Sequence, residues 1–150
     1  MELKTGSSES TLDDKGRVSI PVRFREQFQG DLFITRGQER CVWIIAPPAW
    51  ENLKRNLGNP EVFTAEERRF YKETMIDLKE EVRIDKIGRI AIPSLLRGYA
   101  NLSSKCTVIC SGDRLAVWDS REFIALINKR EEPSTASLNK FGDKDIFSAG

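Results

Sequence analysis

Residues 12–25 of the chain read LDDKGRVSIPVRFR, and residues 84–97 read IDKIGRIAIPSLLR. Six of the fourteen aligned pairs are identical, and three more exchange one apolar residue for another. Unrelated segments of ordinary composition would match at about one position. Because an internal repeat fixes the architecture of a chain, the sequence predicts two equivalent structural units. Any function that depends on the motif is then expected twice in each chain.

The length of the chain determines how the two copies can be arranged. The chain has 150 residues, a size typical of one compact domain. The repeats predict a first unit at 7–53 and a second at 82–125, joined by a helical connector at 54–81. Units this small bury too little apolar surface to be stable without a staple or a partner. We therefore expect the two copies to pack into each other as one pseudo-symmetric core.

Each copy predicts the same order of elements: strand, turn, strand, short helix, two strands and a helix. Val18 and Ile20 alternate with polar residues, the period of a strand with one buried face, which places Arg17 on the opposite face. Pro21 then opens a short helix, because the first helical position has no use for a backbone N–H. The other strands are expected at 32–35, 41–45, 89–92, 106–110 and 115–118. The other helices are expected after Pro47 and Pro48, from Thr64 with Glu67 as capping partner to Leu78, after Pro93, and from Asp119 with Glu122 as capping partner.

The absence of histidine excludes several classes of site. Without histidine there is no His-based acid–base catalysis, no His-activated nucleophile and a poor ligand set for transition metals. The three cysteines, Cys41, Cys106 and Cys110, are interpreted as buried, reduced thiols of a cytosolic protein, with a Cys106–Cys110 disulfide as the alternative. The sequence therefore predicts no catalytic residue, no metal and no cofactor.

The charge of the chain is concentrated in the repeats. The net charge is only +1, from 24 basic and 23 acidic residues, so a nucleic-acid site requires a local excess of positive charge. Residues 13–25 hold four basic and two acidic residues, and 85–97 hold three and one, a net charge of +2 each. No apolar run is long enough to span a membrane, and no signal peptide is found. A cytoplasmic protein is expected, with a polar, flexible C-terminal tail at 131–150.

The aspartate and the glycine of each motif copy can be explained by the structure of a turn alone. Asp13 with Gly16, and Asp85 with Gly88, are suited to a tight turn, since aspartate accepts hydrogen bonds from turn amides and glycine permits positive φ. In that interpretation the arginines are ordinary surface residues, paired with the aspartates.

The functional interpretation concerns the basic residues of the motif. Arg17 and Arg89 are presented on a rigid strand, with Lys15 and Lys86 beside them. A guanidinium forms paired hydrogen bonds with a phosphate, or with O6 and N7 of guanine in the major groove. The local charge favours this interpretation, and these four residues are the predicted DNA-binding residues.

The duplicated pattern Asp-x-x-Gly-Arg-aliphatic-x-Ile-Pro resembles the MraZ family. Each copy is followed by a helix with Phe or Leu and Arg and ends in a strand with Trp; Thr35-Arg36-Gly37 and Val117-Trp118 extend the resemblance, which covers about residues 6–128. MraZ proteins resemble the AbrB-like swapped-hairpin class of bacterial DNA-binding proteins. The resemblance implies a mainly β fold with peripheral α-helices, in which two AbrB-like swapped-hairpin repeats are fused into one pseudo-symmetric β-barrel.

The resemblance also implies a function. It implies a nucleoid-associated transcriptional regulator that assembles into a ring-like homo-oligomer and binds short G-rich direct repeats of double-stranded DNA. The expected operator is the promoter of its own division and cell-wall operon, and no small-molecule substrate or membrane is implied. Arg17 matches the family's DNA-contacting arginine, and Arg89 is its counterpart. The chain departs from the pattern at Ile87, which stands where the first copy has Lys15, and after Glu131.

Two other classes of function were compared with DNA binding. In a protein-interaction or assembly protein without DNA-binding activity, the arginines would be interfacial ion pairs. Partners would then be anchored by Trp43, Trp50 and Trp118, although core packing is the commoner role of tryptophan. In an enzyme, Asp13, Asp14 and Asp85 would hold Mg²⁺, but they lie beside basic residues and have no phosphate-binding glycine loop.

Overall fold

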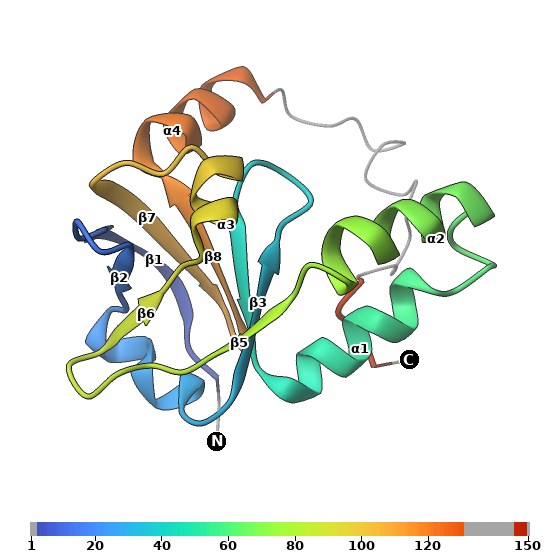
Figure 1. Cartoon of the computed structure of the whole chain (residues 1–150), viewed down its shortest axis with the longest axis horizontal. Coiled ribbons are helices and arrows are strands. Elements are labelled where there is room, and N and C mark those ends of the chain that lie inside the picture. Colours follow the sequence, from blue (N-terminus) through green and yellow to red (C-terminus); the bar gives the residue numbers. More distant parts are fainter. Residues whose placement is uncertain (1–2, 131–145, 150) are drawn as a thin grey trace.

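The computed structural model describes residues 3–130 and 146–149 and consists of antiparallel sheets with helices around them (Figure 1). The first repeat contributes β1 (Thr5–Thr11), β2 (Arg17–Ser19), the 3-10 helix η1 (Val22–Phe28), β3 (Leu32–Arg36), β4 (Val42–Ile45) and α1 (Pro47–Leu57). The second contributes β5 (Glu80–Val82), β6 (Arg89–Ala91), α3 (Ser94–Tyr99), β7 (Lys105–Ser111), β8 (Arg114–Asp119) and α4 (Ser120–Lys129). Between them lie α2 (Ala65–Tyr71) and the π-helical segment η2 (Lys72–Ile76). The order of elements in the first copy therefore returns in the second.

The two repeats are interleaved in one six-stranded sheet. Its antiparallel strands have the order β1-β7-β8-β4-β3-β5, so the hairpin of each repeat is bordered by the first strand of the other. Exchanging β1 with β5, β3 with β7 and β4 with β8 gives the same order read backwards. β4 and β8 pair at the centre. The sheet therefore has a pseudo-two-fold axis, and neither repeat can complete its part of the sheet alone.

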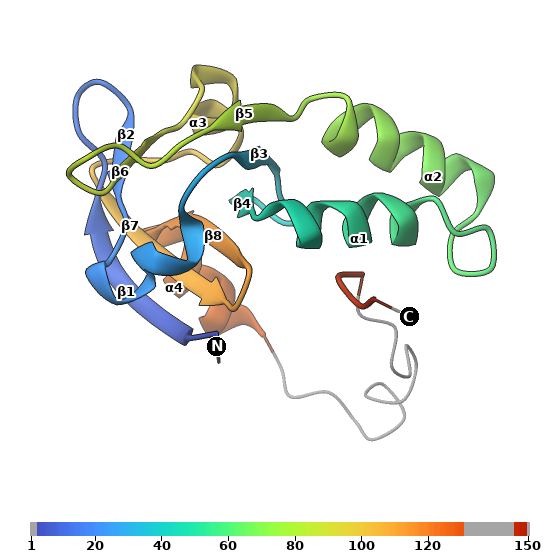
Figure 2. The ribbon, with the colours of Figure 1, turned by 90° about the horizontal axis from the view of Figure 1, so that it is seen from below.

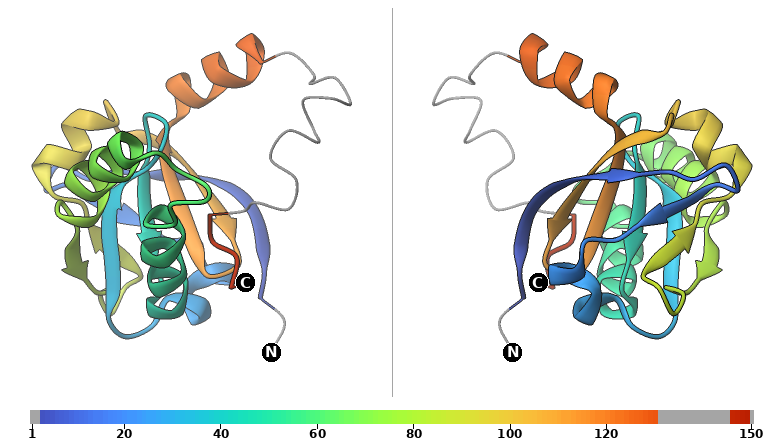
Figure 3. Two further views of the ribbon diagram at one scale, coloured as in Figure 1. Left: turned by 90° about the vertical axis from the view of Figure 1, so that its right-hand side faces the viewer. Right: turned by 90° about the vertical axis from the view of Figure 1, so that its left-hand side faces the viewer.

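A separate two-stranded sheet joins the two copies of the motif. β2 pairs with β6 in the antiparallel register Arg17–Ala91, Val18–Ile90 and Ser19–Arg89. Val18 and Ile90 are equivalent residues of the repeats, so the pseudo-two-fold axis passes between them as well. We call β2 and β6, together with the turns at 13–16 and 85–88, the ribbon. It lies at the end of the molecule opposite α1 and α2 (Figures 1 and 2), and the right-hand view of Figure 3 faces it.

The main hydrophobic core lies between the ribbon and the six-stranded sheet. Val18, Ile20, Ile90 and Ile92 are buried, with at most 3% of their surface exposed. They pack with residues of η1, α3 and the sheet, among them Phe24, Phe28, Ile34, Val42, Leu96, Val108 and Val117. Full burial of one such side chain contributes about 1.5–3 kcal/mol. Because both repeats supply this core, the expected fusion into one unit is confirmed.

A second hydrophobic cluster lies on α1, away from the ribbon. Trp50, Leu53 and Leu57 lie on one side of α1 and are almost fully buried. They pack with Ile45, Ala49 and Met75, and partly buried residues around them include Phe33, Trp43, Tyr71, Ile146 and Phe147. Figure 2 shows α1 and α2 lying side by side, with the segment 146–149 next to α1.

The closed barrel expected from the resemblance is not found among the described residues. β1 and β5 are the two edges of the six-stranded sheet, and β2 and β6 pair with each other instead of joining it. The two strands left to bridge these edges, β2 and β6, have three residues each. Strands this short form too few ladder hydrogen bonds to close the sheet.

The starts of the helices agree with the predicted ones at two of five places. Thr64 and Glu67 form the expected capping box, and Asp119 accepts a hydrogen bond from the Glu122 N–H. The helix expected after Pro47 and Pro48 instead includes both prolines in its first turn, where a missing backbone N–H is tolerated. Pro21 and Pro93 precede their helices as cap residues instead of occupying the first turn. The helix expected to reach Leu78 is α-helical to Tyr71 and π-helical to Ile76.

The cysteines are free and buried, as the sequence indicated. Burial raises the pKa of Cys41 to about 12 and that of Cys106 to about 11, so both thiols stay protonated at neutral pH. Of the tail expected at 131–150, residues 131–145 lie outside the described residues, and 146–149 lie against α1. No helix in the described part of the chain is long and apolar enough to cross a membrane.

Candidate DNA-binding surface

The first turn of the ribbon is organised by one carboxylate. Asp13 Oδ1 accepts hydrogen bonds from the backbone N–H groups of Lys15 (3.0 Å) and Arg17 (2.9 Å). Its Oδ2 accepts a third from Arg17 Nε at 2.8 Å. Gly16 closes the turn with a φ of 80°, a conformation that residues with a side chain rarely adopt. The same aspartate therefore shapes the turn and fixes the direction of the arginine.

The second turn repeats this geometry. Asp85 Oδ1 accepts from the N–H groups of Ile87 (3.0 Å) and Arg89 (2.8 Å), and Oδ2 accepts from Arg89 Nε at 2.9 Å. Gly88 has a φ of 86°. Ile87 takes the place of Lys15 through its backbone only, and its side chain is 61% exposed. The structural interpretation of the aspartates and glycines thus accounts for their contacts in both copies.

The two turns are tied to each other across the pseudo-two-fold axis. The Ile20 N–H donates to the Gly88 carbonyl (2.8 Å), and the Ile92 N–H donates to the Gly16 carbonyl (2.9 Å). Arg89 Nη1 also lies 3.6 Å from Asp13 Oδ2. The ribbon is therefore one rigid element that carries both arginines.

The outward face of the ribbon is small and basic. Arg17 lies opposite Ala91, and Arg89 lies opposite Ser19, so each arginine has a short side chain as its cross-strand neighbour. The side chains of Arg17 and Arg89 are 30% and 26% exposed. Lys15 and Lys86 are exposed in the adjoining turns. The structure thus brings together on one ribbon all four residues that the sequence singled out for DNA binding.

The aspartates of the ribbon are held in their charged form. The pKa of Asp13 is lowered, mainly by the hydrogen bond from the Arg17 N–H; burial opposes this effect, and hydrogen bonds from the Arg17 side chain and the Lys15 N–H lower the pKa further. The pKa of Asp85 is lowered in the same way by Arg89. Each aspartate is therefore a charged partner for the Nε of its arginine. The Nη groups of the arginine lie beyond this contact, at the tip of the side chain.

Arg25 and Arg97 also belong to this surface, although the sequence did not single them out as site residues. A Cβ atom on Gly88 would lie 2.6 Å from Arg25 Nη2, and a Cβ on Gly16 would lie 2.5 Å from Arg97 Cζ. Each guanidinium thus covers the turn of the other repeat, and Arg25 Nε also donates to the Ile20 carbonyl at 2.7 Å. The sequence did hold a clue to this role, because both copies of the repeated stretch end in arginine, at Arg25 and Arg97.

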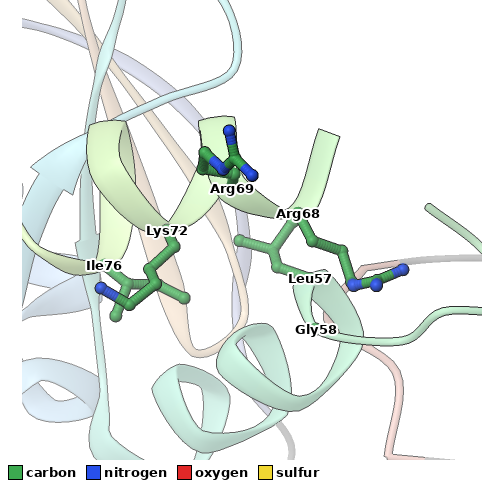
Figure 4. A pocket seen from close by; sticks show the side chains of 6 residues that line it. All are labelled: Leu57, Gly58, Arg68, Arg69, Lys72 and Ile76. Carbon is green, nitrogen blue, oxygen red and sulfur yellow. The ribbon is translucent and has the colours of Figure 1, made fainter. Parts of the chain in front are cut away.

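The other basic residues near the motif or on the connector form no comparable site. Arg23 donates to the Ser7 carbonyl and lies over the Phe24 ring. Between α1 and α2 a hollow of about 390 Å³ is lined by Leu57, Gly58, Arg68, Arg69, Lys72 and Ile76 (Figure 4). Figure 4 shows its three cations pointing in different directions, and two of them are already bound, Arg68 to the Phe63 carbonyl and Lys72 to Asp77. These cations do not converge on one anion.

The described residues contain no cluster of three or more potential metal ligands. Of the three carboxylates named for Mg²⁺ in the enzyme alternative, Asp13 and Asp85 are hydrogen-bonded to backbone amides and paired with arginines. The third, Asp14, is exposed. The tryptophans that would anchor partners in the interaction alternative divide into two groups. Trp50 and Trp118 are buried in the protein, and Trp43 is partly buried against Phe147.

Comparison with known proteins agrees with this duplicated architecture. The family model described as "MraZ protein, putative antitoxin-like" matches the chain twice, over residues 3–73 and 75–142, so the resemblance extends past residue 128. The transcriptional regulator MraZ of Frankia alni is 36% identical over 135 residues, which cover 90% of this chain and 93% of the relative. That of Kineococcus radiotolerans is 36% identical over 126 residues, covering 84% and 87%. That of Paenarthrobacter aurescens is 32% identical over 126 residues, covering 84% and 87%. The chain therefore belongs to the MraZ family, a non-enzymatic family of transcriptional regulators.

Proposed function

We propose that the chain binds double-stranded DNA through the ribbon and, as an oligomer, recognises short direct repeats in the promoter of its own division and cell-wall gene cluster. The exchange of edge strands between the two repeats supports an AbrB-like swapped-hairpin arrangement behind this function. The site of action is the nucleoid in the cytoplasm. The observation that carries the proposal is the pair of arginines on the outward face of one rigid two-stranded ribbon.

The shape of the ribbon suits the major groove of DNA. That groove admits an α-helix or a two-stranded β-ribbon, and its base edges carry a distinct pattern of donors and acceptors for each base pair. Ser19 and Ala91 are too small to keep the ribbon away from the base edges. Arg17 and Arg89 are long enough to reach beyond them, and a guanidinium pairs with O6 and N7 of guanine through two hydrogen bonds.

The lysines and arginines have different roles in this proposal. Lys15 and Lys86 lie in the exposed turns, where a point charge on a flexible stem suits a phosphate. Arg17 and Arg89 are oriented by carboxylates, which favours a defined contact with a base or a phosphate. Because Ile87 replaces a cation in the second turn, we propose that the second copy contributes less binding energy than the first.

An oligomer is required for affinity, because one ribbon offers few contacts. Head-to-tail contacts between copies of this chain form a ring when the rotation between neighbouring copies closes, and we propose this arrangement. Several ribbons on one ring would contact successive direct repeats, and linking the contacts raises the overall affinity by roughly 10²–10⁴. Light scattering at tens of micromolar protein tests this part of the proposal. We expect a mass several times that of one chain, and a monomer would contradict the ring.

The DNA-binding activity is tested with a fluorescent duplex from upstream of the coding start and a scrambled duplex of the same length. We expect tighter binding to the upstream duplex, protection of spaced repeats in a footprint, and an affinity that falls steeply with salt as phosphate counterions are released. Arg69→Ala is the matched control, since Arg69 is exposed on α2 at the far end of the molecule. Equal, salt-insensitive binding of both duplexes would contradict the proposal and favour an interaction protein.

A further inference from the structure

The segment Ile146–Ala149 lies along one side of α1, and α1 binds its main chain (Figure 2). Asn56 Nδ2 donates to the carbonyls of Ile146 and Ser148, both at 2.7 Å. Asn52 Nδ2 donates to the Phe147 carbonyl at 3.4 Å, and Arg55 Nη2 donates to the Ala149 carbonyl at 3.0 Å. Four successive carbonyls are therefore bound by three side chains from one face of a single helix.

Two of the donors on α1 also contact each other. Arg55 Nη2 donates to Asn52 Oδ1 at 2.8 Å, and this contact turns the Asn52 amide nitrogen toward the Phe147 carbonyl. Asn52, Arg55 and Asn56 are spaced by three and four residues, so their side chains lie next to each other on the helix surface. Contacts to carbonyls do not depend on the side chains of the bound peptide, so α1 supplies affinity for the main chain of the segment.

The Phe147 side chain contacts an indole and a guanidinium. The Phe147 ring lies edge-on to Trp43 of β4, with 5.2 Å between ring centroids. The guanidinium of Arg114 in β8 lies over the Phe147 ring, 3.9 Å from the ring centroid. Arg114 is held near Asp113, with Nη1 and Oδ1 3.8 Å apart. An aromatic ring between an indole and a guanidinium gains about 0.5–2 kcal/mol beyond its hydrophobic burial.

We propose that the face formed by α1, Trp43 and Arg114 is a peptide-docking site, and that its occupant is this chain's own segment Ile146–Ala149. The site binds the main chain through α1 and selects the segment by its phenylalanine. The occupant also covers the second hydrophobic cluster, against which Ile146 and Phe147 pack. A tethered segment has an effective concentration in the millimolar range, so even a weak site of this kind is occupied within one chain.

Tryptophan fluorescence of the full-length protein tests this site. Phe147→Ala removes the ring beside Trp43 and should shift the emission to longer wavelength and make it more accessible to acrylamide. Leu95→Ala, which truncates an exposed side chain of α3 away from this face, should have neither effect. Asn56→Ala, which removes two donors and replaces asparagine by a better helix former, should reproduce the effect of Phe147→Ala. If both variants keep the wild-type emission and quenching, the segment does not dock.

Addition of peptide distinguishes docking from a general loss of structure. A peptide of residues 145–150 at millimolar concentration should restore the wild-type emission of the Phe147→Ala protein. The same peptide with alanine at the position of Phe147 should not restore it. Restoration by both peptides, or by neither, would contradict a phenylalanine-selective site.

A mixing experiment tests whether the occupant comes from the same chain. The Phe147→Ala protein is mixed with an excess of the Trp43→Phe protein, which has an intact segment but no indole at the site. We expect the emission of the mixture to be the sum of the two components. A shift toward the wild-type emission would show docking between copies and contradict the proposal. DNA affinity should be unchanged in Phe147→Ala, because the ribbon lies at the other end of the molecule.

Discussion

Arg89 of the second repeat lies within 3.6 Å of Asp13 of the first, measured from Nη1 to Oδ2. The described residues contain no equivalent ion pair between Arg17 and Asp85. The Asp13 carboxylate thus contacts both arginines of the ribbon, whereas Asp85 contacts only Arg89. The pseudo-symmetry of the fold is broken at the surface that we propose for DNA binding.

This asymmetry predicts unequal effects of removing the two carboxylates. Asp13→Ala removes the carboxylate partner of Arg17 and one of the two carboxylate partners of Arg89, whereas Asp85→Ala removes only the other partner of Arg89. Each change also adds one positive charge, which strengthens non-specific attraction to phosphates. We therefore expect the ratio of affinities for operator and scrambled DNA to fall in both variants, and to fall further in Asp13→Ala. Equal ratios, measured by anisotropy at one salt concentration, would show that the contact between Asp13 and Arg89 has no role in recognition.

The ribbon should lose stability in acid. The folded protein holds the pKa of Asp13 and Asp85 below the ordinary value of 3.8, chiefly through backbone hydrogen bonds. A group with a lowered pKa stabilises the fold fully above its unfolded value, and the contribution is lost as the pH falls through the folded value. Urea denaturation between pH 7 and pH 2.5 should show a decline below about 4 that is shallower in the Asp13→Asn, Asp85→Asn double variant. Parallel profiles would contradict this assignment.

Gly16 and Gly98 form a matched pair for testing the turn. Alanine at Gly16 would strain a backbone with positive φ, at a cost of about 1–2 kcal/mol, and would displace Arg97. Alanine at Gly98 meets no atom within 4 Å and lies in α3, where it should stabilise the helix by about 0.5–1 kcal/mol. Thermal melts should therefore move in opposite directions, and only Gly16→Ala should weaken DNA binding. A harmless Gly16→Ala substitution would show that the turn conformation is not required.

The first repeat should not fold by itself. In a fragment of residues 1–62, β1 would lose its partner β7, β3 would lose β5 and β4 would lose β8. The core between the ribbon and the sheet would also lose Ile90, Ile92 and Leu96. We expect this fragment to be unfolded, to aggregate or to dimerise, as judged by circular dichroism and light scattering. A monomer with a cooperative melt would contradict the interleaved core.

The elements with strong hydrophobic periodicity were predictable from the sequence. Val18 and Ile20 gave the strand and its buried face, and the repeat assigned the same structure to Ile90 and Ile92. The position of Arg17 and Arg89 followed, because residues alternate between the two faces of a strand. The turn could also be predicted, since aspartate and glycine at this spacing satisfy backbone amides and permit positive φ.

The exchanged edge strands could not be delimited from the sequence. β1 reads TGSSEST and β5 consists of Glu80, Glu81 and Val82, so neither has the apolar alternation of a strand. Both are strands because of backbone pairing with the other repeat, and a partner distant in sequence leaves no local signal. The placement of Arg25 over Gly88 and of Arg97 over Gly16 could not be predicted either, because each pair joins residues that are distant in the sequence.

The most direct test of DNA binding by the ribbon compares wild type and Arg17→Ala on duplexes with one and with two operator repeats. Arg17→Ala removes a contact worth about 1–3 kcal/mol per engaged site. Because every engaged subunit loses this contact, binding to the two-repeat duplex should nearly vanish, while Arg89→Ala should weaken it less. Circular dichroism should be unchanged, since Arg17 lies on the outward face, opposite the buried Val18. Folded Arg17→Ala protein that binds the two-repeat duplex with wild-type affinity would contradict the assignment of the ribbon as the DNA-binding site.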